Sequence, residues 1–459
     1  MELTLKDIAQ KTGGRILQGA PSASFRRFNI DSRKSRPGEL FFALVAQRNG
    51  HAFIPDAVKK GASGVVVSEN IPPPGPDVAL IQVKDTLTAL QELARKVLSS
   101  QPVKVIGITG SNGKTTTKEF AASLLSGTLS VLKSEGNYNN HIGLPLCLLR
   151  LENGHRAAVL EMGMSAPGEI ARLTEIAPPD LAVITNIRPV HLEFFKSIEE
   201  IAEAKKEILE GLKPNGTAVL NHNDPRVRKL ARRWKGDTIF YGTSRTSLIR
   251  AEKIRRAGLE GLSFELVYGD QRGPVRLPFF YSSFLENFLA ASAVAFRCGV
   301  PLEEIQKRAR HLKPFRMRGE VLRLPGGVVL IDDSYNSNPE ALKSVLRDAA
   351  TIPARRRIAV LGDMLELGPR EKTYHRQVGR HVVRWGWDLL ATVGPLSRHT
   401  AQGAIRAGMA EEQIQEFENS EKAAKALRSL LRPGDLLLIK GSRRMNMDRI
   451  VAKLKKKET

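Results

Sequence analysis

The chain has 459 residues, enough for two to four domains, and its 42% hydrophobic and 26% charged residues are typical of a globular protein. No apolar stretch approaches the roughly 20 residues that span a bilayer, and the N-terminus lacks the apolar core of a secretory signal. Cys147 and Cys298 lie far apart in apolar surroundings, which indicates buried thiols rather than a disulfide or metal pair. We therefore expect a cytoplasmic protein without membrane insertion.

The net charge of +23 allows nucleic acid, acidic membranes or phosphorylated compounds as partners. Part of the excess is local, because Leu212–Ala257 carries twelve Lys or Arg against three Asp or Glu. The sequence has no zinc-finger spacing and no aromatic RNA-binding motif, and only 6% of its residues are aromatic. We interpret the basic excess as a solvated surface and expect no stable nucleic-acid partner; a nucleic-acid-associated ATPase stays open as the alternative.

The first segment, residues 1–84, is predicted to be a compact α/β unit with short helices at Leu3–Gly13 and Ala52–Lys60. Ser32 and Arg33 follow a short strand, where a hydroxyl and a guanidinium group can hold a pyrophosphate. By themselves these two residues are more typical of a surface turn, so the pattern alone favours no ligand there.

Val103–Phe120 is the stretch most typical of a binding site. Val105–Ile108 predicts a buried strand, a glycine-rich turn follows, and a helix is predicted to run to about Leu125. Glycines let backbone N–H groups close on an anion, and the helix N-terminus adds partial positive charge. The general P-loop has glycine six residues before its lysine, where this chain has Ile108, so the motif is a variant. The predicted phosphate cradle consists of Gly110, Ser111, Asn112, Gly113, Lys114, Thr115 and Thr116.

Two later strands are predicted to end near metal-binding side chains. Ala157–Leu160 runs into Glu161, and Leu181–Ile184 is followed by His191. Ligands of a doubly wound parallel sheet bind at the carboxyl ends of its strands, so both side chains are candidate Mg²⁺ ligands together with the hydroxyl of Thr115. A single histidine is more often structural, and only its predicted position beside Glu161 favours a metal site.

The segment Ser197–Leu212 predicts an amphipathic helix that begins with a capping box of Ser197 and Glu200. Lys205 falls inside the apolar stripe of this helix, whereas its neighbour Lys206 faces away. A lysine on an apolar seam either extends to solvent or is functional, because burial lowers the pKa of an amine and makes it reactive. The pattern alone leaves both possibilities open.

The second half of the chain is predicted to alternate strands and helices. The helix Phe284–Phe296 contains Asn287, and the strand Val328–Ile331 runs into Asp332 and Asp333. The P-loop lies more than two hundred residues earlier, so these acids are not its Walker B element. The alternation that continues to the C-terminus predicts a Rossmann-like unit.

Seven motifs occur in an order that resembles the Mur ligase and folylpolyglutamate synthetase superfamily along nearly the whole chain. They are D-S-R at 31–33, N-G-H at 49–51, T-G-S-N-G-K-T-T at 109–116, A-K-K-E-I at 204–208, D-S-Y-N-S-N-P at 333–339, V-L-G-D-M-L-E-L-G at 360–368 and K-G-S-R at 440–443. The resemblance implies an α/β fold with the three-domain Mur ligase architecture. A small N-terminal α/β domain (residues 1–84) would bind a UDP-sugar, a central P-loop parallel-sheet domain (85–313) would bind ATP, and a C-terminal Rossmann-like domain (314–459) would bind an incoming dipeptide.

The resemblance also implies a role for individual residues. It implies that two Mg²⁺ ions are held by Thr115, Glu161, His191 and a carbamate that CO₂ forms on Lys205. It implies that Asn287 contacts adenine, Arg318 the phosphates and Asp333 the ribose of ATP. It implies substrate contacts from Ser32, Arg33, Asn137, Asn140, Asn336 and Asn338.

The reaction that this resemblance implies is ATP-dependent amide formation in the synthesis of peptidoglycan precursors. A terminal carboxylate of UDP-N-acetylmuramoyl-tripeptide would be activated as an acyl phosphate, and the amine of D-alanyl-D-alanine would then attack it. Catalysis would rest on Lys114, Glu161, His191 and Lys205. We expect a monomer; the alternative within this class is a ligase that adds another amino acid or resembles folylpolyglutamate synthetase.

Overall fold

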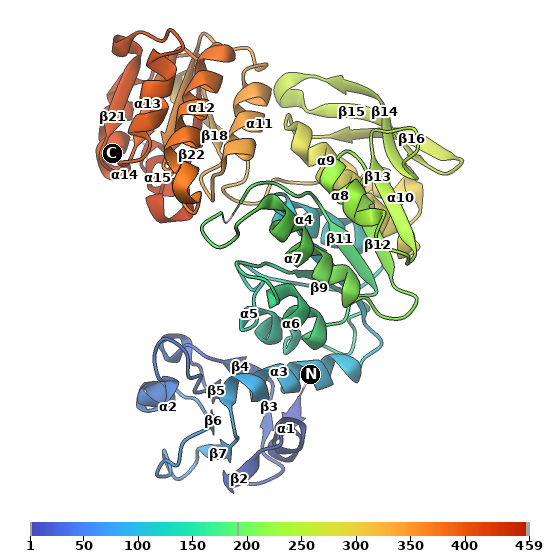
Figure 1. The fold of residues 1–459 in the computed structure, drawn as a ribbon. Helices are drawn as coiled ribbons and strands as arrows, with labels where there is room; N and C mark the ends of the chain where they lie inside the picture. Colours follow the sequence, from blue (N-terminus) through green and yellow to red (C-terminus); the bar gives the residue numbers. More distant parts are fainter. Residues whose placement is uncertain (1, 191, 456–459) are drawn as a thin grey trace. The chain divides into compact units, whose positions relative to one another are not determined.

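The computed structural model describes residues 2–190 and 192–455 (Figure 1). Strands of mostly parallel sheets alternate with helices along the chain, which confirms the predicted α/β class. In the described part of the chain, no helix combines the length and the apolar character needed to cross a membrane.

The N-terminal part forms a five-stranded sheet with the strand order β2-β7-β6-β5-β4 and a separate β1-β3 pair. Strands β4 to β7 pair in parallel, and β2 is antiparallel to β7. The bounds are β1 (Leu3–Thr4), α1 (Leu5–Thr12), β2 (Arg15–Gln18), β3 (Ser24–Phe25), β4 (Arg27–Asn29), β5 (Glu39–Phe42), α2 (Ile54–Lys59), β6 (Gly64–Val67) and β7 (Ala79–Gln82). Phe41, Val65, Val67 and Leu80 form the core against α2.

A longer helix, α3 (Thr86–Ser99), follows. Asp85 caps it, since the carboxylate accepts a hydrogen bond of 2.6 Å from the backbone N–H of Thr88. Leu90, Leu93 and Val97, which recur at helical spacing, are buried.

The middle of the chain forms a nine-stranded sheet with the order β16-β15-β14-β13-β12-β11-β8-β10-β9. Its strands are β8 (Lys104–Thr109), β9 (Val131–Lys133), β10 (Ala157–Glu161), β11 (Leu181–Ile184), β12 (Thr217–Asn221), β13 (Thr238–Gly242), β14 (Ile249–Arg256), β15 (Leu262–Tyr268) and β16 (Gln271–Leu277). Its helices are α4 (Lys114–Leu125), α5 (Gly143–Leu148), α6 (Glu169–Ile176), α7 (Ile198–Glu210), α8 (Pro225–Ala231), α9 (Ser282–Arg297) and α10 (Leu302–Ala309). Strand β8 and helix α4 have the predicted positions, whereas α7 ends two residues before the predicted Leu212.

The C-terminal part forms a six-stranded sheet with the order β17-β18-β22-β19-β20-β21, drawn in orange to red in Figure 1. Only the β17–β18 pair is antiparallel. The bounds are β17 (Glu320–Leu324), β18 (Val328–Asp332), α11 (Pro339–Ala349), β19 (Arg356–Gly362), α12 (Glu371–Arg384), β20 (Leu389–Val393), α13 (Arg398–Ile405), β21 (Ile414–Phe417), α14 (Ser420–Leu430), β22 (Asp435–Lys440) and α15 (Asp448–Lys455). A parallel sheet covered by helices is the Rossmann-like arrangement that the sequence predicted.

Single turns of 3₁₀ helix complete the secondary structure. They are η1 (Ser32–Lys34), η2 (Gly50–Phe53), η3 (Gly258–Glu260), η4 (Pro325–Gly327), η5 (Gly368–Arg370), η6 (Glu411–Gln413) and η7 (Arg443–Met445). The predicted helix Ala52–Lys60 is thus divided between η2 and α2.

The chain divides into two compact units. The first contains the residues up to Thr109, Leu125–Val183 and Ala204–Ala218, and the second contains Gly110–Leu124, Ile184–Glu203 and the chain from Val219 onward. These units do not follow the predicted boundaries after residues 84 and 313, so those boundaries stay a prediction.

Candidate active site

The phosphate cradle lies between β8 and α4, and only glycine fits two of its positions. Gly110 and Gly113 have φ angles of 146° and 84°, in the region that disfavours side chains. A Cβ atom on Gly110 would lie 1.8 Å from Oγ1 of Thr185, and one on Gly113 would lie 2.3 Å from Oδ1 of Asn287. The chain therefore has the narrow backbone turn at a helix N-terminus that suits a phosphate group.

The segment after β11 holds this turn in shape. The backbone N–H of Asn112 donates to Oδ1 of Asn186 at 2.9 Å, and the Thr185 hydroxyl donates to the Asn112 carbonyl at 2.6 Å. The backbone N–H of Arg188 donates to the Ser111 hydroxyl at 2.9 Å, and its guanidinium lies 2.7 Å from the buried Asp224 carboxylate. No signal in the sequence indicated that Thr185, Asn186 or Arg188 would hold the cradle, because these contacts join segments more than seventy positions apart.

The first turn of α4 carries the charged and hydroxyl groups of the motif. Nζ of Lys114 donates to the carbonyl of Gly110 at 2.8 Å, so this cation lies over its own loop. Thr115 and Thr116 are both buried, each 4% exposed. An ammonium group, a hydroxyl group and the helix N-terminus therefore lie together at one end of α4, as anion binding requires.

Helix α9 brings Asn287 to the same turn. Asn287 is buried, and its Oδ1 accepts a hydrogen bond of 3.3 Å from the Thr117 hydroxyl. Phe284, one turn earlier, is part of an aromatic cluster with Phe120 of α4 and Phe279. The cluster fixes α9 against α4 and directs Asn287 toward the cradle.

Asp348 of α11 anchors the start of α9. The buried carboxylate accepts hydrogen bonds from the backbone N–H and the hydroxyl of Ser282 at 2.8 and 2.6 Å. Two guanidinium groups also approach it, Arg347 at 2.9 Å and Arg256 at 3.6 Å. The carboxylate thus satisfies a free N–H group at the helix N-terminus and pairs with two cations.

We expect Asp348→Ala to lower the free energy of unfolding by about 2 kcal/mol, since it leaves a half-buried N–H group and two guanidinium groups without this acceptor. A shift in the thermal unfolding midpoint would measure this loss. The control is Asp270→Ala, which removes an exposed acid from the turn between β15 and β16. Equal midpoints in both variants would contradict the anchoring role.

In the C-terminal part, Asp333 begins the sequence D-S-Y-N-S-N-P, and Arg318 contacts Tyr335 of the same motif. Asp332 and Asp333 differ sharply, because Asp332 accepts from the Ser334 hydroxyl at 2.5 Å and burial raises its pKa. The Asp333 carboxylate instead lies 2.6 Å from Nζ of Lys440. The Arg318 guanidinium stacks on the Tyr335 ring at 4.1 Å, and its buried Nε has no hydrogen-bond partner among the described residues.

Asn338 touches the phosphate cradle directly. Its Nδ2 donates to Oδ1 of Asn112 at 2.7 Å, and its Oδ1 caps α11 by accepting from the Ala341 N–H at 2.9 Å. Asn336 lies on the same loop, where its carbonyl accepts from Lys440 at 2.9 Å. The second unit thus brings together Asn112, Gly113, Asn287 and Asn338 at the cradle.

The first unit carries Glu161 at the end of β10, in register with Ile108 of β8. The buried carboxylate accepts a hydrogen bond of 3.0 Å from Nδ2 of Asn139, and the Glu161 N–H donates to the Ser134 hydroxyl at 3.1 Å. The loop between β9 and α5, which carries Asn137 and Asn140, therefore reaches this strand end. The contact comes from Asn139, which sequence reasoning did not select.

Asn137 and Asn140, the two residues of that loop that were predicted to contact the substrate, have different surroundings. Asn137 is exposed, and Asn140 caps α5 by accepting from the N–H groups of Ile142 and Gly143 at 3.2 and 2.8 Å. Asn140 therefore has a structural task in addition to any substrate contact.

Lys205 is 2% exposed on α7, so its side chain does not extend to solvent. Its neighbour Lys206 faces outward and lies 2.7 Å from the exposed carboxylate of Glu210. The predicted capping box is half formed. The Glu200 N–H donates to the Ser197 hydroxyl at 3.2 Å, but the Glu200 carboxylate accepts from the N–H of Lys196 rather than of Ser197.

In the N-terminal sheet, Ser32 and Arg33 lie on η1 after β4. The Arg33 guanidinium, whose side chain is 83% exposed, binds the Asp31 carboxylate at 2.8 and 2.9 Å. Ser32 is buried. The two predicted side chains thus share a turn, with Arg33 paired to a carboxylate.

The donor types present fit Mg²⁺, since Thr115 and Glu161 offer hydroxyl and carboxylate oxygens. His191 lies outside the described residues. Within 2–190 and 192–455, no three His, Cys, Asp or Glu side chains gather closely enough to hold a metal by themselves. A Mg²⁺ ion bound by Thr115 or Glu161 therefore needs further oxygen ligands, for example from phosphate groups or water.

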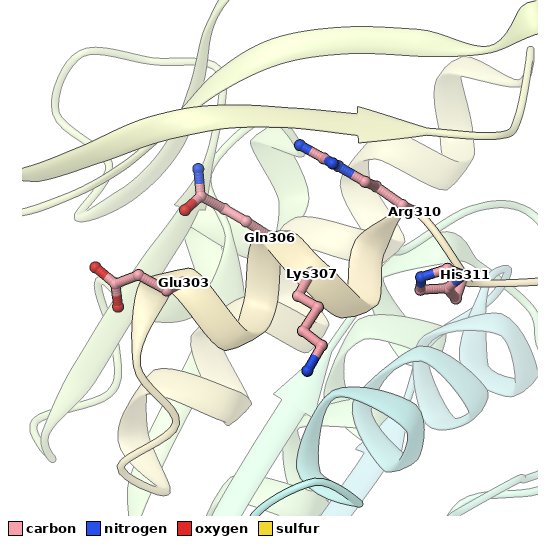
Figure 2. Close-up of a pocket in the computed structure, with 5 residues that line it drawn as sticks. All are labelled: Glu303, Gln306, Lys307, Arg310 and His311. Carbon is pink, nitrogen blue, oxygen red and sulfur yellow. The ribbon is translucent and has the colours of Figure 1, made fainter.

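A separate cavity of about 280 Å³ lies along α10. Figure 2 shows its lining side chains, which project from α10 and the residues just after it: Glu303, Gln306, Lys307, Arg310 and His311. It contains no residue of the predicted site.

Two family models match the chain. The Mur ligase middle domain matches residues 108–295, and the Mur ligase, glutamate ligase domain matches residues 317–443. The first match covers the phosphate cradle and Asn287, and the second covers Arg318, Asp333 and Lys440.

Relatives match the chain over nearly its full length. The UDP-N-acetylmuramoyl-tripeptide–D-alanyl-D-alanine ligase of Bacillus subtilis is 35% identical over 98% of each chain. The crystal structure of MurF from Acinetobacter baumannii superposes with a TM-score of 0.90 at 29% identity, covering 100% of this chain and 99% of that one. MurF ligase from Thermotoga maritima, solved in complex with ADP, gives a TM-score of 0.81 at 32% identity, covering 94% and 97%.

Proposed function

The chain belongs to the Mur ligase family, and from this premise we propose that it joins D-alanyl-D-alanine to UDP-N-acetylmuramoyl-tripeptide in an ATP-dependent reaction. The relatives that match it over nearly their full length carry that activity in their names. The observation that carries the proposal is the glycine cradle at the start of α4, which has the geometry for an ATP phosphate and lies inside the matched region.

The reaction proceeds through two substitutions. The terminal carboxylate of the tripeptide attacks the γ-phosphorus of ATP, ADP leaves, and an acyl phosphate forms. The free amine of the dipeptide then attacks the acyl carbon, phosphate leaves, and the amide bond forms with loss of the amine proton. Both steps gain most from positioning and from neutralising phosphate charge. In this chain the cradle N–H groups and Lys114 supply that neutralisation.

We assign the metal ligands on chemical grounds. Thr115, Glu161, His191 and a carbamate on Lys205 would hold two Mg²⁺ ions, which when bound supply further positive charge at the transferred phosphoryl group. Burial disfavours the charged form of an amine, and a neutral amine is the form that reacts with CO₂. The burial of Lys205 on α7 supports this assignment.

We further assign nucleotide contacts to the cradle residues Gly110, Ser111, Asn112, Gly113, Lys114, Thr115 and Thr116 and to Asn287, Arg318 and Asp333. Substrate contacts are assigned to Ser32, Arg33, Asn137, Asn140, Asn336 and Asn338. The proximity of Asn287 and Asn338 to the cradle supports their assignment. Asn140 and Asn338 also cap helices, so replacing them would disturb structure as well as binding.

The proposal includes three domains with limits at residues 84 and 313, a monomeric state and a place in the cytoplasm. The strands of the three large sheets come from residues 15–82, 104–277 and 320–440, which supports those limits. The substrates are water-soluble nucleotides and peptides, which supports a cytoplasmic reaction.

Phosphate release from ATP tests the proposed function. Purified protein with Mg²⁺ is expected to release phosphate only when UDP-N-acetylmuramoyl-tripeptide and D-alanyl-D-alanine are both present, and the product mass should equal the two substrates less one water. Single amino acids in place of the dipeptide test for a different member of the family. Phosphate release that ignores both substrates and rises with duplex DNA would contradict the ligase and favour a nucleic-acid-associated ATPase.

A further inference from the structure

Lys440 is a buried cation at the carboxyl end of β22. This strand lies between β18 and β19, and Lys440 is in register with Leu361 of β19. The Lys440 side chain is 5% exposed. A lysine is rarely buried without a partner, because removing its charge from water is costly unless the charge is paired.

Two contacts of Lys440 close the loop that carries Asp333. Its Nζ donates to Oδ2 of Asp333 at 2.6 Å and to the carbonyl of Asn336 at 2.9 Å. One ammonium group therefore spans the turn from Asp333 to Asn336. Two further hydrogen bonds stabilise the same turn. The Ser334 hydroxyl donates to the Asp332 carboxylate, and the Tyr335 N–H donates to the Met317 carbonyl at 3.1 Å.

The contact fixes which Asp333 oxygen faces a ligand. Lys440 occupies Oδ2, and among the described residues no other donor contacts the carboxylate. The Asp333 side chain retains 19% exposure. Oδ1 is thus the atom available to accept from hydroxyl groups of a bound molecule, and carboxylate acceptors of this kind give strong, directional hydrogen bonds.

We propose that Lys440 is a positioning residue for nucleotide binding, which holds the Asp333 carboxylate so that Oδ1 accepts hydrogen bonds from the ribose hydroxyls of ATP. This inference rests on the proposed ATP-dependent function. It adds a specificity element to it, because the Lys440–Asp333 pair would distinguish a ribonucleotide from one that lacks both hydroxyls.

The test compares the binding of ADP and 2′,3′-dideoxy-ADP to the full chain in the presence of Mg²⁺ by isothermal titration calorimetry. The wild-type protein is expected to bind ADP at least about tenfold more tightly than the dideoxy analogue, as the loss of hydrogen bonds to a charged group implies. Lys440→Met should weaken the binding of ADP about tenfold and leave the binding of the dideoxy analogue unchanged. The ratio of the two dissociation constants, dideoxy-ADP over ADP, should then approach one. Asp333→Asn should give the same ratio, and the double variant should lose nothing more.

The matched control is Lys343→Met, which removes a half-exposed lysine of α11 that pairs with Glu340 at 3.8 Å. This variant should show the same ratio of affinities for ADP and the dideoxy analogue as the wild-type protein. Lys440→Arg, which keeps a cation beside Asp333, should restore part of the ratio lost in Lys440→Met.

Three results would overturn the inference: an unchanged ratio in Lys440→Met, an equal loss of affinity for both nucleotides, or a wild-type ratio of one. A wild-type protein that binds neither nucleotide would instead remove the proposed function, and this inference with it. If Lys440→Met does not fold, as judged by circular dichroism, Lys440→Gln is measured in its place and the same outcomes decide.

Discussion

Replacing Lys205 with alanine is expected to lower the rate of dipeptide-dependent phosphate release at least about a hundredfold, the loss typical of removing one preorganised charged group from a reaction centre. The side chain is 2% exposed on α7. A carbamate would turn this cation into an anionic oxygen donor, the ligand type that Mg²⁺ prefers. Steady-state kinetics with both substrates would measure the loss.

Bicarbonate separates the carbamate from other roles of Lys205. Wild-type protein depleted of CO₂ should lose activity and regain it with added bicarbonate, whereas Lys205→Ala should stay inactive because it has no amine to react. The matched control is Lys206→Ala, which removes the neighbouring outward-facing lysine and its ion pair with Glu210. A near-normal rate in Lys205→Ala would contradict the carbamate hypothesis. A wild-type rate that does not depend on CO₂ would contradict it as well.

Local sequence signals predicted the parts of the site that depend on neighbouring residues. Strand β8, the glycine turn and helix α4 occur where the glycine and lysine pattern placed them, because steric limits at each residue select them. The 3.6-residue apolar repeat placed Lys205 on the inner face of its helix, although the pattern left open whether the side chain extends to solvent, and the structure shows it buried. In both cases the information lies within one or two helical turns.

The sequence did not predict contacts between residues that lie far apart in the chain. Asn186 and Arg188 brace the cradle across more than seventy positions, and Lys440 reaches Asp333 across 107. Asn139 and Asn140 are adjacent polar residues of one loop, yet only Asn139 contacts Glu161 while Asn140 caps α5. Composition does not distinguish such neighbours, because the direction of each side chain depends on packing that the whole fold determines.

The second large effect is expected at Gly113, where alanine should weaken ADP binding at least about a hundredfold. Gly113 has a φ of 84°, and a Cβ atom there would lie 2.3 Å from the buried Oδ1 of Asn287. A residue with a side chain is strained by about 1–2 kcal/mol in this conformation, so the turn is expected to leave it. Displacing Asn287 also removes its hydrogen bond with Thr117, and restoring the cradle on binding would then cost affinity at about a factor of ten for each 1.4 kcal/mol.

Gly386→Ala separates backbone strain from the shape of the cradle. Gly386 also has a positive φ, of 66°, but nothing lies within 4 Å of the position that its Cβ would occupy. This variant should lose about 1 kcal/mol of stability and bind ADP as the wild type does. If Gly113→Ala bound ADP normally, the turn would not close on a phosphate, and the cradle could not supply the charge neutralisation on which both steps of the ligase reaction depend. If both variants lost affinity alike, a general loss of stability would explain the effect, and the approach of Asn287 to Gly113 would have no part in nucleotide binding.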